Sequence, residues 1–100
     1  MRILLPMDST NTKEAKLTSL EDVKIWCQIL IEDGEVKETK HADKKEEFED
    51  YSECVVVTND NEYVWPFIEL SMLVLVAHTQ RYLDDIVEAY IFKELHDLAY

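Results

Sequence analysis

The 100-residue sequence contains a single glycine, Gly34. Glycine-rich loops that hold phosphates need several glycines close together, because the backbone must approach the phosphate closely. Dinucleotide-binding loops and P-loops are therefore both excluded. The sequence also lacks the GxSxG and HExxH motifs of hydrolases and zinc proteases.

Cysteine is equally scarce. The two cysteines, Cys27 and Cys54, lie far apart and lack the CxxC spacing that is typical of metal and redox sites. Each stands beside large apolar residues in a predicted strand. We therefore expect both to be small core residues rather than a disulfide or a pair of metal ligands.

Long hydrophobic runs are absent as well. No apolar stretch approaches the roughly 20 residues that span a bilayer. The opening segment Met1–Met7 contains Pro6 and is not followed by a small-residue cleavage site, so it does not resemble a signal peptide. We expect a soluble, cytoplasmic protein.

Basic residues are outnumbered by 22 acids to 10, which gives a formal charge of −12. The excess lies after residue 31, because the first 31 residues contain four acids and four bases. Such a surface repels the phosphates of nucleic acids and of anionic lipids. We expect neither nucleic acid nor membrane as a partner, and a solubilising role for the charge.

Two short apolar runs, Cys54–Val57 and Leu73–Ala77, are rich in β-branched residues. This composition is typical of strands that are covered on both faces. The segment between them is long enough for a crossover helix, expected at about Asn61–Leu70, so the two strands should be parallel. Pro66 should either start this helix or kink it.

The remaining pattern completes a five-stranded mixed sheet with three helices on its two faces. This is the layout of an α/β, ribonuclease-H-like three-layer domain in the order β-β-β-α-β-α-β-α, spanning residues 1–100. The other expected elements are strands at Arg2–Met7 and Val23–Ile31, a turn at Glu32–Gly34, a charged edge strand at Glu35–His41, and helices at Asp43–Tyr51 and Gln80–Leu98, capped by Asp43 and Thr79.

Polar residues follow the three expected parallel strands. They are Asp8, then Asn59 with Asp60, then His78. Ligands of open α/β sheets gather at the carboxyl ends of such strands. Asp8, Asp60 and His78 could bind a divalent metal and support phosphoryl transfer. Turn and capping roles are the commoner reason for Asp and Asn at strand ends, and they are favoured here.

Other candidate groups have simpler explanations. His41 and His96 have no partner at ligand spacing and are expected to face solvent. The segment Tyr63–Phe67 could line an aromatic pocket, but packing of the central helix onto the sheet is favoured.

The whole pattern resembles the nitrogenase iron–molybdenum-cofactor biosynthesis (NifX-like) family. The similar stretches are the opening Met-Arg-Ile-Leu-Leu-Pro-Met-Asp, the hairpin around Glu32-Asp33-Gly34 and the ending Asp-Ile-Val-Glu-Ala-Tyr-Ile-Phe-Lys-Glu-Leu. The resemblance spans nearly the whole chain in order and pattern. Its most specific part is the ending.

The resemblance implies a ribonuclease-H-like fold and a non-enzymatic role in binding iron–sulfur or iron–molybdenum cofactor precursors. Typical members have His-Phe-Gly-Arg before the second strand, whereas Leu17–Lys24 here contains neither that His nor that Gly-Arg. Asn59-Asp60-Asn61 replaces the glycines usual after the fourth strand. The alternatives are a protein-interaction or homodimerisation module, through Tyr63–Phe67 or a sheet edge, and a metal-dependent phosphoryl-transfer enzyme using Asp8 and Asp60.

Overall fold

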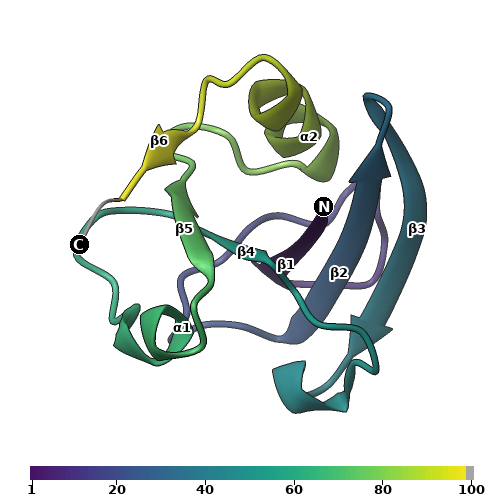
Figure 1. The fold of residues 1–100 in the computed structure, drawn as a ribbon. Coiled ribbons are helices and arrows are strands. Elements are labelled where there is room, and N and C mark those ends of the chain that lie inside the picture. Colours follow the sequence, from purple (N-terminus) through teal and green to yellow (C-terminus); the bar gives the residue numbers. More distant parts are fainter. Residues whose placement is uncertain (99–100) are drawn as a thin grey trace.

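The computed structural model describes residues 1–98, and within them the chain is a mixed α/β fold with one six-stranded sheet and two α-helices (Figure 1). The strand order across the sheet is β3-β2-β1-β4-β5-β6. The elements are β1 (Arg2–Met7), β2 (Ile25–Glu32), β3 (Glu35–Ala42), a 3-10 turn (Lys45–Glu47), β4 (Cys54–Val57), α1 (Trp65–Glu69), β5 (Leu73–Val76), α2 (Leu83–Ile91) and β6 (His96–Asp97).

The two short apolar runs form neighbouring interior strands of the sheet, and they are parallel as predicted. β4 pairs in parallel with β5, and also with β1 on its other side. β2 runs antiparallel to β1, and β3 antiparallel to β2. The β2–β3 turn has positive φ at both Asp33 and Gly34, as the Asp-Gly pair predicts.

The helices cover opposite faces of the sheet (Figure 1). Cys54 and Val56 of β4 pack in the cluster that contains Leu83 and Ile86 of α2. Val55 and Val57 pack in the other cluster, with Phe67 of α1. This alternation is the period-two geometry of a strand, and burial on both faces explains why the run is continuously apolar.

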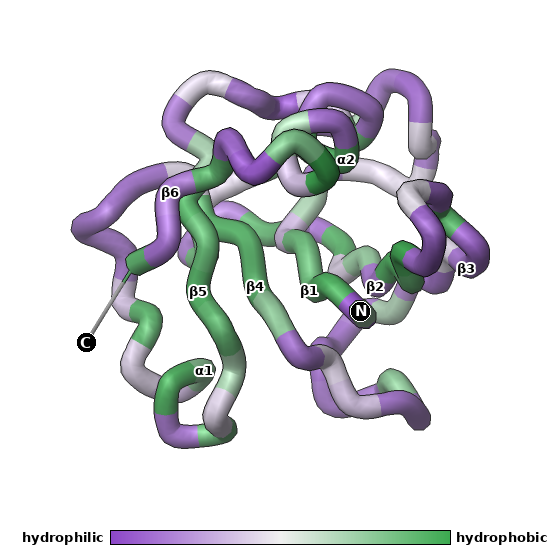
Figure 2. The backbone as a smooth tube through the Cα atoms, turned by 45° about the horizontal axis from the view of Figure 1, so that its top comes forward, coloured by the Kyte–Doolittle hydropathy of each residue, from purple (hydrophilic) through white to green (hydrophobic). Residues whose placement is uncertain are grey.

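The edge strand β3 is polar, as predicted, and contrasts with the hydrophobic β1, β4 and β5 in Figure 2. Lys40 on β3 donates a hydrogen bond to Asp50 over 3.1 Å. This contact raises the pKa of Lys40 and lowers that of Asp50. Solvated charges of both signs along β3 oppose pairing with a further strand.

The prediction of a helix at Gln80–Leu98 is wrong at both ends. α2 spans only Leu83–Ile91, its N-cap is Tyr82 without a side-chain cap, and the chain returns as β6, antiparallel to β5. The helix ends where Lys93 adopts a φ of 58° and Glu94 N–H reaches the Ala89 carbonyl over 2.7 Å. The left-handed residue is a lysine and not a glycine, so no stop signal can be read from the sequence at this point.

Leu95 and Leu98, which follow α2, fit the apolar stripe of the predicted helix but do not lie on a helix. Leu95 packs against the cluster on the α2 face, whereas Leu98 packs against the cluster on the α1 face. Residues three apart share one face of a helix, but lie on opposite faces of an extended segment. Leu98 N–H is bonded to the Val74 carbonyl, which continues the contact with β5.

The predicted helix Asp43–Tyr51 is a single 3-10 turn, Lys45–Glu47. Its N-cap is Lys44 rather than Asp43, and the Glu47 carboxylate accepts the Lys44 N–H. Gln28, a buried polar side chain of β2, donates to the Asp50 carbonyl and the Ser52 hydroxyl. These bonds tie residues 50–52 to β2.

The crossover helix is shorter than predicted. α1 spans Trp65–Glu69, with Pro66 in its first turn, instead of Asn61–Leu70. Proline cannot donate to an earlier carbonyl, so it is tolerated only at the beginning of a helix. In residues 1–98 the sheet has six strands instead of the expected five, and there are two α-helices instead of three. Neither of these helices is long and apolar enough to cross a bilayer.

Candidate functional site

Two loops meet beyond the carboxyl ends of β1 and β4, which are neighbouring parallel strands. After β1 the chain continues to β2 on one side, and after β4 it continues to β5 on the other. Such a switch in direction leaves a crevice where open α/β sheets bind ligands. The crevice here has a volume of about 290 Å³, and is lined by Ser19, Leu20, Glu21, Asn59, Asn61, Glu62 and Tyr63.

The Glu62 carboxylate links the two loops by hydrogen bonds. One carboxylate oxygen accepts the Leu20 N–H over 2.5 Å. The other accepts both the N–H and the hydroxyl of Thr58, each over 2.6 Å. The sequence suggested Glu62 only as part of a helix cap with Asn59. Its real partner loop lies 42 residues away, which no local pattern indicates.

The side chains of Asn59 and Asp8 each accept a hydrogen bond from a backbone N–H of their own loop. The Asn59 side chain accepts the Asn61 N–H over 2.8 Å, an Asx turn. Asp8 accepts the Lys16 N–H over 2.8 Å and thereby closes the long loop after β1. Both contacts agree with the turn role favoured from the sequence.

Asp60 and His78 are brought together by the fold. His78 Nε2 lies 2.8 Å from an Asp60 carboxylate oxygen, and each side chain is about half exposed. The ring of His96 on β6 lies 5.8 Å from the His78 ring. The sequence pattern leaves His96 without a partner, because it predicts a helix at this residue rather than a strand beside β5. A solvent-exposed pair of this kind contributes about 0–1 kcal/mol to the free energy of unfolding.

The strand-end residues do not assemble as one metal site. Among residues 1–98, no three His, Cys, Asp or Glu side chains are arranged to hold a metal ion. Asp60 meets His78, whereas Asp8 and Asn59 are each bonded within their own segments. Their role in ligand binding remains a prediction.

Both cysteines are core residues, as predicted. Cys27 and Cys54 are unpaired and at most 1% exposed. They lie on β2 and β4, with β1 between them, so two interstrand spacings of about 4.8 Å separate them. A disulfide requires a closer approach. Burial raises the pKa of each thiol to about 12.

The aromatic segment is divided between core and surface. Phe67 is buried and its ring lies 6.2 Å from that of Trp26, so it packs α1 onto the sheet as predicted. Tyr63 is 74% exposed and Trp65 is 50% exposed. Tyr63 lines the crevice, at the point where the Asn59 loop leads into α1.

Comparison with known proteins shows the fold but not a family. No protein-family pattern matches the chain, and no curated protein matches it by sequence. The chain is similar in structure to a putative dinitrogenase, MJ0327, from Methanocaldococcus jannaschii. Its crystal structure has a TM-score of 0.77 and 21% identity, over 99% of this chain and 95% of that one.

Two further structures agree with this likeness. The NMR structure of MJ0327 has a TM-score of 0.76 and 22% identity, over 100% of this chain and 94% of that one. The crystal structure of PH0822 has a TM-score of 0.73 and 15% identity, over 100% and 97%. Identity this low establishes a shared fold alone.

Proposed function

We propose that this chain is a non-catalytic, NifX-like domain of ribonuclease-H-like layout that acts by binding a protein partner at the crevice. Three observations support the proposal. The fold resembles MJ0327 along its whole length, the crevice lies at the switch between β1 and β4, and an exposed aromatic residue, Tyr63, stands at its rim. The last observation is the one on which partner binding depends.

A non-catalytic role agrees with the available side chains. A nucleophile needs a base within hydrogen-bond reach. His78 Nε2 is bonded to Asp60, not to a hydroxyl or thiol. Both thiols are buried and held neutral by their raised pKa.

A metal–sulfur cofactor precursor, which the family likeness suggests, does not fit the residues present. Protein ligands of iron–sulfur clusters are mainly thiolates, with histidine in some cases. The crevice offers hydroxyl, amide and carboxylate oxygens, and its charged side chains, Glu21 and Glu62, are both acidic. Anionic clusters would be repelled there. The thiols lie in the core, inaccessible from the crevice.

Anaerobic incubation with ferrous iron and sulfide tests this disagreement. We expect no visible absorption band on the desalted protein, because the crevice has no thiolate. The Cys27→Ala variant is the matched control for iron bound after partial unfolding. A stable band on the folded wild type, retained by this variant, would restore cofactor binding as the function.

Partner binding predicts a specific loss on removal of Tyr63. Truncation of a hot-spot residue lowers the binding free energy by about 2 kcal/mol or more, a roughly thirtyfold loss of affinity, and tyrosine is enriched among such residues. We expect Tyr63→Ser to weaken self-association or association with a co-purifying partner by that order, as measured by sedimentation velocity. Phe92→Ser, which removes a 67% exposed ring at the end of α2, should have no effect.

The outcomes are distinct. A wild-type chain that stays monomeric at all concentrations, with no partner, counts against the proposal. An equal loss in the two variants would place the contact elsewhere or show that it is unspecific.

A further inference from the structure

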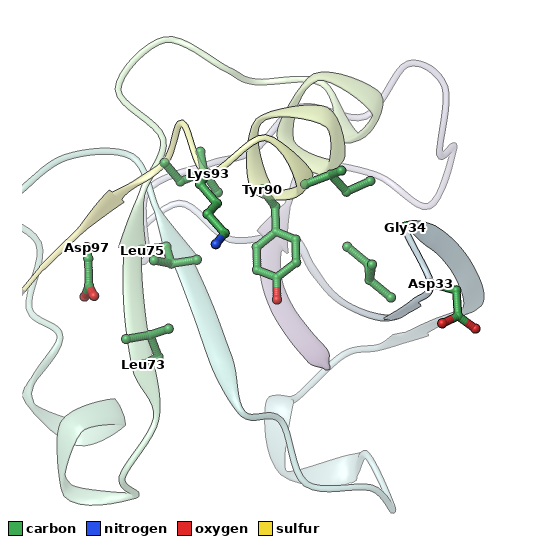
Figure 3. A pocket seen from close by; sticks show the side chains of 10 residues that line it. Asp33, Gly34, Leu73, Leu75, Tyr90, Lys93 and Asp97 are labelled. Carbon is green, nitrogen blue, oxygen red and sulfur yellow. The ribbon is translucent and has the colours of Figure 1, made fainter.

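A second cavity lies on the α2 face of the sheet, away from the crevice. It has a volume of about 580 Å³, and it extends from the β2–β3 turn to β5 and β6 (Figure 3). The residues of its lining near the sheet ends are Ile31 near the end of β2, Asp33 directly after β2, and Leu73 at the start of β5. It therefore opens toward the amino ends of the parallel strands, whereas the crevice lies at their carboxyl ends.

The early end of α2 creates this cavity. A nine-residue helix is about 14 Å long, whereas the eight-residue strand β2 extends for about 26 Å. A helix through residue 98 would have covered the rest of this face. Because the chain turns away at Lys93, Leu73 remains 40% exposed and Ile91 36% exposed.

The lining has the composition of a small-molecule pocket. Ligand sites typically have volumes of about 300–1,000 Å³, with mainly apolar walls and a few polar groups. Six of the ten lining residues are apolar or aromatic: Ile31, Leu73, Leu75, Tyr90, Ile91 and Leu95. The floor is formed by side chains of β5, and the roof by Tyr90 and its neighbours on α2 (Figure 3).

Four polar side chains of the pocket, Asp33, Tyr90, Lys93 and Asp97, form no hydrogen bond or ion pair within residues 1–98. The Lys93 amine extends into the space beside Leu75 and Tyr90, and it forms no ion pair in this part of the chain (Figure 3). The Tyr90 hydroxyl points into the open pocket, and it forms no hydrogen bond with residues 1–98. Burial raises the pKa of Tyr90, with smaller effects from Cys54 and Glu53, so the phenol stays a neutral donor.

We propose that this pocket binds a small apolar carboxylic acid, whose carboxylate pairs with Lys93 and whose hydrocarbon part lies along Leu73, Leu75 and Tyr90. Lys93 is the only cation of the lining, while Asp33 and Asp97 stand at its two ends. Glu53 accepts the Arg2 N–H and adds negative charge on the Tyr90 side. The carboxylate is therefore expected on the Lys93 side of the ring. The overall acidity is screened within about 8–10 Å at moderate salt.

Octanoate and 1-octanol, which share one hydrocarbon chain and differ in the charged group, test the proposal. Titration of the ¹⁵N-labelled chain should shift the amides of Leu73, Leu75, Tyr90 and Lys93 with both probes. Lys93→Gln should weaken octanoate roughly fivefold, the order expected for one partly solvated ion pair, and leave octanol unchanged. Lys24→Gln, which removes an exposed cation before β2, should leave both unchanged.

Each other outcome overturns the assignment. Absent shifts, or shifts confined to the crevice loops, remove the pocket as the binding site. An equal loss in Lys93→Gln and Lys24→Gln shows a response to net charge alone. Shifts of the pocket amides with protein concentration, before any probe is added, show that a second copy of the chain covers this face.

Discussion

Replacement of Glu62 by alanine is expected to lower the free energy of unfolding by about 3 kcal/mol. The carboxylate accepts three hydrogen bonds, from Leu20 N–H and from the N–H and hydroxyl of Thr58. Hydrogen bonds to a charged group contribute about 1.5–3 kcal/mol each to stability. Glu62 is only half-buried, so in the alanine variant water can bond to some of the freed N–H and hydroxyl groups, and the net loss is smaller than the sum of three such bonds. Urea denaturation measures the loss as a lower midpoint at an unchanged slope.

Two matched variants distinguish this role from a general effect of charge. Glu62→Gln keeps one acceptor oxygen and should lose less stability than Glu62→Ala. Glu21→Ala removes an exposed acid from the same crevice and should change stability by less than about 0.5 kcal/mol. If Glu21→Ala and Glu62→Ala are equally destabilising, the three hydrogen bonds are not what joins the loops.

Alkaline pH is expected to destabilise the fold through the two buried thiols. The pKa of Cys27 and Cys54 is raised from 9.0 to about 12 in the folded chain, because burial disfavours the thiolate. Between these values the unfolded chain loses thiol protons that the folded chain keeps. Stability is therefore fully present below about pH 9, and falls as pH rises toward 12, by up to about 1.4 kcal/mol per pH unit for each thiol.

Cysteine variants isolate this effect from tyrosine and lysine titration in the same range. Denaturation at about pH 8 and about pH 10.5 should give a smaller pH-dependent loss for Cys54→Ala than for the wild type, although the variant starts less stable because of the cavity. The difference in slope is the relevant quantity. An unchanged slope would mean that the thiols ionise equally well in the folded chain. Slow thiol alkylation of the native protein, accelerated by urea, should accompany the expected result.

The sheet could be predicted from the sequence because its signals are short-range. The continuous apolar runs at Cys54–Val57 and Leu73–Val76 have no polar face, so they fit only strands covered on both sides. Asp33-Gly34 specifies a tight turn through its positive φ values. The charged strand β3 could only be an edge.

The candidate site was predicted less completely. The sequence placed Asp8, Asn59, Asp60 and His78 at strand ends, and the structure joins only Asp60 to His78. Glu62 and His96 were missed because their contacts depend on distant segments: the loop at Leu20 and the strand β5. Such contacts leave no spacing in the sequence that could reveal them.

The residues alone determined the hydrophobic centre with its parallel strands and the acidic net charge. They also determined the scarcity of glycine, which excludes phosphate-binding loops. Those properties follow from side-chain chemistry and from the backbone preferences of neighbouring residues. Only the tertiary structure decided where the last helix stops, since Leu95 and Leu98 suit a helical stripe and an extended segment equally well. Packing against both faces of the sheet selects the extended form, and the face that α2 leaves uncovered is where the second pocket opens.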